Sequence, residues 1–263
     1  MRRFPPPWRN WSDKRDRVVL WGTGASRGIG AATALRAAAD GWDVALNYAS
    51  DKAAAETVAQ GVTAAGRRAL VVAGDIAKPA DVEALFATVD SELGPLAGLV
   101  NNAGTTGQVK RVDEMTAGDI AGVFDLNVTG LMLCCGAAVR RMSTRHGGQG
   151  GVIVNLGSIA ARLGAAGEFV HYAGSKGAVE SVTLGLAREV AGEGVRVNAV
   201  APGMIDTEIH ASAGAPDRVA RLGPTVPQGR AGTAEEVAEA VVWLLSDAAR
   251  YCAGSIIDVS GGR

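Results

Sequence analysis

Short apolar runs alternate with longer, alanine-rich segments of helical spacing through most of the chain. Each run is followed within two residues by glycine, asparagine or proline, residues that mark the turn out of a strand. This alternation predicts one α/β domain with a doubly wound parallel sheet of about seven strands and helices on both faces. The predicted strands are Val18–Trp21, Val44–Leu46, Ala69–Val72, Leu99–Val100, Gly151–Leu156, Val195–Val200 and Ser255–Val259.

Helix boundary signals fall between these strands. Thr116–Asp119 and Thr233–Glu236 read as capping boxes, and Pro79 stands where a first helical residue is expected. The first box predicts a long helix from Thr116 to about Arg145. Residues 204–230 show little periodicity and contain three prolines, so we expect a substrate lid there.

The amino-terminal residues break the pattern. Residues 1–15 are basic and proline-rich, carry Trp8 and Trp11, and lack the apolar core of a secretory signal. We predict a disordered, dispensable tail, with a docking arm on a neighbouring subunit as the alternative. The folded domain would then span residues 16–263.

Composition excludes several classes of protein. The 263 residues carry a net charge of −1, which disfavours nucleic acid as an obligate partner, and no uninterrupted apolar run has the length of a membrane span. Cys134, Cys135 and Cys252 form no disulfide framework, and three scattered histidines predict no metal site. Free thiols favour a reducing compartment, so we expect a cytoplasmic protein.

A glycine-rich turn follows the first predicted strand, with Gly24, Gly28 and Gly30 leading into a helix that ends before Gly41. Glycines at such a turn let the backbone approach a pyrophosphate on the amides of the helix amino terminus. At the start of a repeating βα pattern, the turn predicts dinucleotide binding.

A second polar group follows the strand Gly151–Leu156. Ser158 lies at its carboxyl end, where open α/β sheets bind ligands. Tyr172 and Lys176 are four residues apart and share one face of a helix. A neighbouring ammonium favours the phenolate, so we expect Lys176 to lower the pKa of Tyr172 and make it an acid/base near pH 7.

Taken together, these motifs resemble the short-chain dehydrogenase/reductase family, in its single-domain Rossmann-fold branch, from Val18 to Gly262. The motifs are Thr23-Gly24-xxx-Gly28-Ile29-Gly30, Asp75, Asn101–Gly104, Asn127, Ser158, Tyr172-xxx-Lys176, Pro202-Gly203 and Asp258–Gly262. Glu168–Tyr172 and the ending are also similar to bacterial glucose-1-dehydrogenase-like oxidoreductases. Trp21 departs from the small apolar residue usual in the family and makes the packing there uncertain.

The resemblance implies a catalytic role for each of four residues. Tyr172 would be the general acid/base, Lys176 its pKa-lowering partner and a ribose ligand, and Ser158 the donor to the substrate oxygen. Asn127 would hold Lys176 through a water molecule. A buried amide among apolar neighbours must be hydrogen-bonded, which agrees with such a role.

NADP(H) is the expected cofactor, with NAD(H) possible. No carboxylate stands at Asn47 or Tyr48 to accept ribose hydroxyls, whereas Arg27 and Ser50 can bind a 2′-phosphate. Asp51, one residue after Ser50, argues against NADP(H), because a carboxylate repels a 2′-phosphate. Asp75 is expected near the adenine and Asn101 beside the adenosine ribose. The full set of expected cofactor contacts is Gly24, Ser26, Arg27, Gly28, Ile29, Gly30, Asn47, Ser50, Asp75, Ile76, Asn102, Ala103, Gly104, Tyr172, Lys176, Pro202, Gly203, Ile205 and Thr207.

The predicted function is an oxidoreductase that interconverts a small-molecule carbonyl and a secondary alcohol by direct hydride transfer. A dinucleotide-binding sensor or assembly protein without turnover is the alternative, and an epimerase or dehydratase is disfavoured by the short chain. Apolar helices around 119–140 and 175–190 favour a homotetramer.

Overall fold

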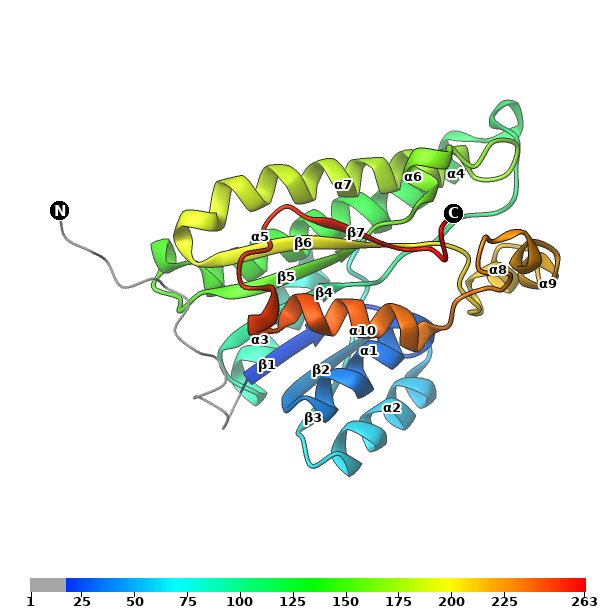
Figure 1. The fold of residues 1–263 in the computed structure, drawn as a ribbon. Helices are drawn as coiled ribbons and strands as arrows, with labels where there is room; N and C mark the ends of the chain where they lie inside the picture. The colour runs from blue at the N-terminus through cyan, green and yellow to red at the C-terminus, as the bar shows by residue number, and fades with distance from the viewer. Residues whose placement is uncertain (1–17) are drawn as a thin grey trace.

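The computed structural model describes residues 18–263 and shows a parallel, seven-stranded sheet in the order β3-β2-β1-β4-β5-β6-β7 (Figure 1). The predicted amino-terminal tail lies outside the described residues. The predicted fold class is confirmed; five strands run longer than predicted, β5 has the predicted bounds and β7 is one residue shorter. They are β1 (Val18–Gly22), β2 (Trp42–Tyr48), β3 (Ala69–Ala73), β4 (Leu96–Asn101), β5 (Gly151–Leu156), β6 (Val195–Pro202) and β7 (Ile256–Val259).

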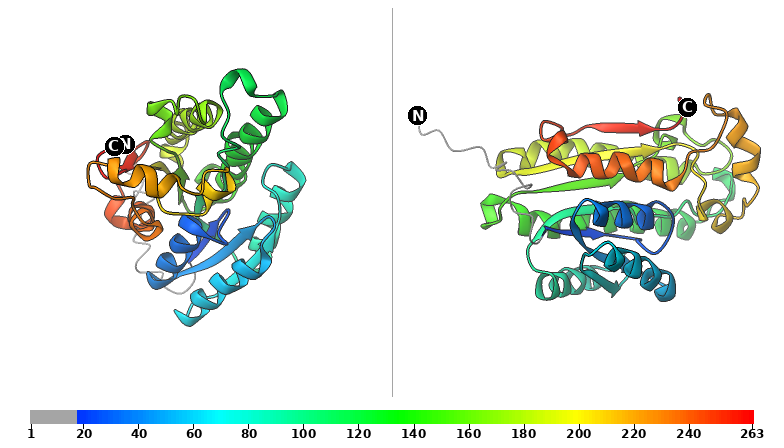
Figure 2. Two further views of the ribbon diagram at one scale, coloured as in Figure 1. Left: turned by 90° about the vertical axis from the view of Figure 1, so that its right-hand side faces the viewer. Right: turned by 60° about the horizontal axis from the view of Figure 1, so that its bottom comes forward.

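Helices cover both faces of the sheet (Figure 2). One layer holds α1 (Gly28–Ala39), α2 (Lys52–Ala64) and α10 (Ala234–Leu245); the other holds α3 (Pro79–Glu92), α5 (Leu131–Met142) and α7 (Val170–Val190). The side chains of successive strand residues point to opposite layers, because a β-strand has a period of two residues. In β1, for example, Trp21 packs with the α3 side and Leu20 with the α10 side.

Trp21 is fully buried and resolves the packing question raised by its size. Its ring meets Phe86 of α3 edge-on, with the centroids 4.0 Å apart. An edge-on pair brings the positive rim of one ring to the negative face of the other and stabilises the contact. The large side chain therefore fills space between β1 and α3 instead of disturbing the glycine turn.

The long helix predicted from Thr116 to about Arg145 is interrupted. It divides into α4 (Ala117–Phe124), a π-helical turn at Asp125–Gly130 and α5, and Ser143 leads into a 3₁₀ turn at Thr144–His146. The capping box at Thr116 is confirmed. A π turn inserts one residue into the helical repeat and commonly marks a functional position, and Asn127 lies inside this one.

The helical stretch Ala117–Met142 has a mean hydropathy of 1.6. Among the described residues it alone has the length and composition needed to cross a membrane. Length and composition are weak criteria, because the core helix of an α/β domain satisfies them too. Here α5 packs on the sheet through Cys134, Ala138 and Met142.

The predicted lid contains short helices. Between β6 and α10 the chain forms α8 (Ile209–Ser212), α9 (Arg218–Leu222) and a 3₁₀ turn at Gly223–Thr225, and it lies at the end of the sheet where the strands terminate (Figure 1). One further helix, α6 (Ala160–Leu163), follows β5. Single 3₁₀ turns occur at Val112–Glu114, Ala191–Glu193 and Asp247–Ala249.

Candidate active site

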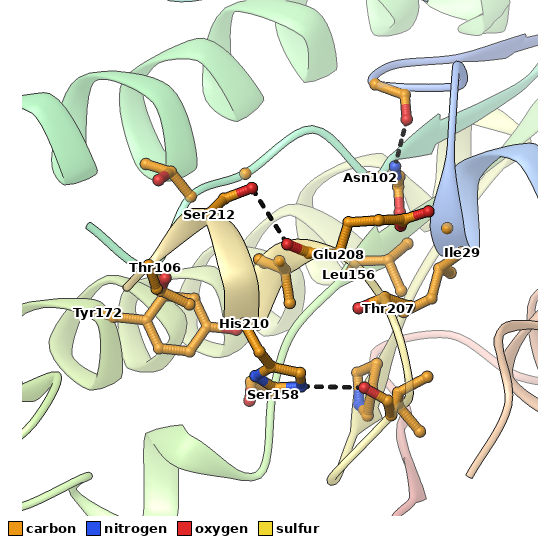
Figure 3. Close-up of a pocket in the computed structure, with 18 of the residues that line it drawn as sticks. Ile29, Asn102, Thr106, Leu156, Ser158, Tyr172, Thr207, Glu208, His210 and Ser212 are labelled. Carbon is orange, nitrogen blue, oxygen red and sulfur yellow. Dashed lines mark hydrogen bonds between the residues drawn. The ribbon is translucent and has the colours of Figure 1, made fainter. Parts of the chain in front are cut away.

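A cavity of about 900 Å³ lies at the carboxyl ends of the strands (Figure 3). It crosses the point where the strand order reverses, between β1 and β4. Open α/β sheets leave a crevice there because successive crossovers go to opposite faces. The loops after β1, β2, β3, β4, β5 and β6 all contribute to its wall.

The glycine turn after β1 is built for close approach. Gly24 and Gly28 have positive φ angles of 60° and 53°, which favour glycine. A Cβ on Gly30 would lie 2.4 Å from Gly24 O and 2.5 Å from Asn102 Nδ2, so Gly30 packs behind the turn and does not line the cavity. Asn102 donates to Gly24 O (2.9 Å) and fastens the turn to β4.

The amino terminus of α1 can receive an anion. Arg27 is the N-cap residue, its side chain makes no capping hydrogen bond, and the first turn contains no acidic residue. The first N–H groups of a helix have no partner within the helix and carry partial positive charge. A dinucleotide pyrophosphate fits this combination of free amides and absent side chains.

Thr23 is a site residue that the sequence interpretation named only as part of a motif. Its hydroxyl accepts from the N–H groups of Asn102 and Ala103, each at 3.0 Å. The side chain is fully buried. Thr23 therefore sets the position of the chain after β4 relative to the glycine turn.

The residues near the end of β2 bear on the choice between NADP(H) and NAD(H). Arg27 and Ser50 are exposed at the cavity wall, and the Arg27 guanidinium has no partner among the described residues. Asp51 caps α2 by accepting from Ala54 N (2.9 Å), so its carboxylate is already committed. Asn47 lines the wall, but its side-chain amide donates to Gly74 O (2.9 Å) within the sheet edge.

Asn101, the last residue of β4, and Asn102, which follows it, point into different surroundings. Asn102, Ala103 and Gly104 line the cavity, whereas Asn101 is buried away from it. The Asn101 amide donates to Asn155 Oδ1 (2.9 Å), so the expectation that it lies beside a ribose is not met. Adjacent strand residues point to opposite faces, which forces the two side chains apart. Asp75 and Ile76 line the adjoining wall, as expected.

Ser158 and Tyr172 meet in the wall of the cavity. The Ser158 hydroxyl accepts from Ala160 N (3.1 Å) and interacts with the phenol of Tyr172. Burial raises the pKa of Tyr172, and the hydrogen bond with Ser158 opposes that rise. The pKa shift is thus opposite to the depression expected from Lys176, because desolvation of the phenolate outweighs the hydrogen bond that favours it.

Lys176 lies on the same face of α7 as Tyr172. Its ammonium is buried, donates to Leu156 O (2.6 Å) and is 5.8 Å from the centre of the Tyr172 ring. Burial lowers the pKa of Lys176 to about 8. The ammonium therefore sits at the cavity wall, still protonated at neutral pH.

Asn127 is buried behind the cavity wall. Its Oδ1 accepts from Thr105 N (2.8 Å), and its Nδ2 donates to Thr105 O (2.8 Å) and Ser175 Oγ (3.0 Å). Ser175 Oγ in turn donates to Tyr172 O (2.7 Å). Asn127 therefore joins the loop after β4 to α7 directly, in addition to any relay to Lys176.

The chain after β6 closes the cavity. Pro202, Gly203, Ile205 and Thr207, which we expect to contact the cofactor, all line it. A Cβ on Gly28 would lie 3.4 Å from Thr207 Cγ2, so the start of the lid touches the glycine turn. The lid thus spans both ends of the cavity.

Sequence reasoning did not assign roles to the residues that fasten the lid. Arg218 of α9 forms an ion pair with Glu168, just before α7, and its guanidinium lies 5.1 Å from the centre of the Phe169 ring. Arg221 lies 3.7 Å from the same carboxylate. The spacing of two arginines in α9 was visible in the sequence, but their partner lies about 50 positions earlier, beyond any local pattern.

Known proteins share this architecture. A family model described as enoyl-(acyl carrier protein) reductase matches residues 22–263. The oxidoreductase YgfF of Escherichia coli (strain K12) is 52% identical over 241 residues, covering 92% of this chain and 98% of YgfF.

Two similar solved structures are complexes with the cofactor. A short-chain dehydrogenase from Burkholderia cenocepacia J2315, in complex with NADP, is 35% identical, with a TM-score of 0.84 and coverage of 94% of this chain and 97% of that one. A blue fluorescent protein from a metagenomic library, in complex with NADPH, has the same identity and TM-score and coverage of 93% and 97%. The chain therefore belongs to the short-chain dehydrogenase/reductase family of NAD(P)-dependent oxidoreductases.

Proposed function

We propose that this protein interconverts a carbonyl and a secondary alcohol with NADP(H), using Tyr172 as the general acid/base. The observation that carries the proposal is the meeting of Ser158, Tyr172 and Lys176 in the wall of the cavity that begins at the glycine turn. A proton and a hydride must reach adjacent atoms of one bond, so both sources must face the same space. Because the glycine turn and these three side chains line one cavity, the site supports catalysis rather than cofactor binding alone.

The chain's own residues would handle the proton and the positioning. Bound nicotinamide supplies or accepts the hydride. Ser158 holds the substrate oxygen beside the phenol, and Tyr172 gives that oxygen a proton during reduction or removes one during oxidation. The raised pKa of Tyr172 keeps the phenol protonated at neutral pH, which suits reduction.

The cofactor would bind along the wall of this cavity. The amides at the start of α1 would hold the pyrophosphate, and Arg27 with Ser50 would hold the 2′-phosphate. Lys176 would hold the ribose next to the nicotinamide. NAD(H) lacks the 2′-phosphate and would therefore bind without the contact to Arg27.

A substrate screen tests this function. Purified protein is mixed with NADPH or NADH and a panel of ketones and aldehydes, and with NADP⁺ and secondary alcohols, while absorbance at the nicotinamide band is followed. We expect turnover with NADPH. Saturable NADPH binding without turnover across the panel would favour the sensor or assembly role.

We predict that Arg27→Ala lowers the NADPH-to-NADH ratio of kcat/KM about 10- to 100-fold. A charge-assisted contact to phosphate contributes on the order of 1.5–3 kcal/mol, and NADH lacks the phosphate that makes it. Steady-state kinetics with both cofactors measures the ratio. Arg145→Ala, an exposed arginine near β5, should leave it unchanged, and an unchanged ratio in Arg27→Ala would exclude this assignment.

We also predict a homotetramer in the cytoplasm. The outer faces of the helices around α5 and α7 leave Ile120, Met132 and Leu184 well exposed, which fits twofold contacts between copies. The three cysteines are free, which fits a reducing compartment. Sedimentation at micromolar concentration should give a tetramer of the 26.7 kDa chain, and a monomer there would refute it.

A further inference from the structure

His210 on α8 lines the same cavity as Ser158 and Tyr172. Its Nε2 lies 2.9 Å from Ile205 O. A backbone carbonyl can only accept, so Nε2 must carry the proton. In the neutral ring Nδ1 is then an acceptor, and it has no hydrogen-bond partner among residues 18–263.

The imidazole stays neutral at pH 7. Burial is the main cause that lowers the pKa of His210, and the positive charge of Arg218 lowers it further, against opposing effects from Ile205 O and Asp206. Desolvation always disfavours the charged form of an imidazole. Nδ1 therefore keeps its lone pair under the conditions of turnover.

His210 shares this part of the cavity with the reacting groups. Figure 3 shows Tyr172, Ser158 and His210 around the same space, with the His210 ring held by its bond to Ile205. Ser158 and Tyr172 offer hydroxyl groups to one substrate oxygen. A second substrate group that faces His210 must donate a hydrogen bond, or the acceptor is buried unpaired at a cost.

The charges nearby decide what kind of donor fits. Arg218 puts positive potential on His210, which disfavours a substrate ammonium. Arg218 is itself paired with Glu168 and stacked on Phe169, and Arg221 also lies near Glu168, so neither arginine is free for a substrate carboxylate. A neutral hydroxyl meets both conditions.

We propose that His210 selects substrates with a hydroxyl on the carbon next to the reacting carbon, that is, α-hydroxy ketones and the matching vicinal diols. The inference rests on the proposed function and names its substrate class. His210 acts as a specificity-determining residue through Nδ1.

Three four-carbon ketones that differ only at C1 test the inference. They are 2-butanone, 1-hydroxy-2-butanone and 2-oxobutanoate, which carry a methyl, a hydroxymethyl and a carboxylate group beside the same carbonyl. With NADPH, the parent should reduce 1-hydroxy-2-butanone with a kcat/KM at least about tenfold above that of 2-butanone, the effect of about one satisfied hydrogen bond. A ratio near one, or a preference for 2-oxobutanoate, overturns the proposal.

Variants show whether His210 causes the preference. His210→Phe should bring the ratio of kcat/KM for the hydroxy ketone to that for 2-butanone close to one, with the Kd of NADPH within about threefold of the parent. His210→Asn should retain part of the preference, because the amide oxygen of Asn can replace the Nδ1 acceptor. His146→Phe, at an exposed histidine far from the cavity lining, is the matched control and should change nothing.

The outcomes separate the two proposals. Reduction of 2-butanone without a hydroxyl preference, or a preference that survives in His210→Phe, overturns the role of His210 and leaves the proposed function standing. Failure of all three ketones while another carbonyl of the panel is reduced overturns the role of His210 and leaves the proposed function standing; absence of turnover across the whole panel, with NADPH bound, contradicts both.

Discussion

Tyr172→Phe should lower kcat by ~10²–10⁴-fold while the Kd of NADPH stays within about threefold of the parent. The substitution removes one oxygen atom, the only atom of that side chain that can carry the proton. The ring remains, so the wall of the cavity and the 5.8 Å approach of the Lys176 ammonium remain as well. Binding and turnover should therefore separate cleanly in this variant.

The measurement is steady-state kinetics on the best substrate of the screen, with NADPH binding followed by fluorescence titration. Tyr251→Phe, at a tyrosine that is fully exposed, is the matched control and should behave as the parent. A Tyr172→Phe variant with more than a tenth of the parental kcat would mean that another group carries the proton.

The sheet and the cavity could be predicted from the sequence because they follow local rules. Apolar runs followed within two residues by glycine, asparagine or proline marked the strands, and parallel strands bring their carboxyl ends to one edge. That is why residues as far apart as Arg27, Asp75 and Thr207 line one cavity, as expected. Periodicity predicted the sheet and the edge where ligands bind, and the resemblance to the family supplied most of the individual cavity residues.

The π turn at Asn127 could not be predicted because it leaves no break in the hydrophobic pattern. Both an unbroken helix and an inserted residue keep Val123 and Leu131 apolar and buried. What decides the turn is the pairing of the Asn127 amide with Thr105 and Ser175, which lie in other parts of the chain. Contacts of that range are invisible in a sequence window.

The direction of the Tyr172 pKa shift was also beyond the sequence. Spacing places the phenol and the ammonium on one face of a helix, but it gives no depth of burial. In the fold, desolvation acts on both groups and pushes each toward its neutral form, raising the pKa of Tyr172 and lowering that of Lys176. Burial thus separates the two pKa values and leaves that of Lys176 below that of Tyr172.

Lys176→Met should abolish most activity and yet raise the melting temperature at pH 7. Without the ammonium, both kcat and the affinity for NADPH should fall, and the loss in kcat should not add to that of Tyr172→Phe, because the two side chains act on one proton transfer. The gain in stability follows from the pKa of about 8, against an ordinary value of 10.5.

The sign of the stability effect depends on pH. Below pH 8 the folded protein must hold a buried ammonium, which costs roughly 3 kcal/mol for a shift of this size. Between pH 8 and 10.5 the unfolded chain binds the proton more readily than the folded one, so that cost fades as pH rises. Methionine escapes the cost, but it leaves Leu156 O without its donor, a loss of about 1 kcal/mol.

The difference in melting temperature between Lys176→Met and the parent should therefore depend on pH, which thermal unfolding at two pH values measures. At pH 7 the melting temperature of Lys176→Met should exceed that of the parent by a few degrees, since about 1 kcal/mol shifts a domain of this size by ~2–4 °C. At pH 10 to 10.5 the advantage should vanish or reverse. Lys52→Met, at an exposed lysine paired with Glu56, should show no such dependence on pH. Equal destabilisation of Lys176→Met at both pH values would show that the buried ammonium carries no desolvation cost.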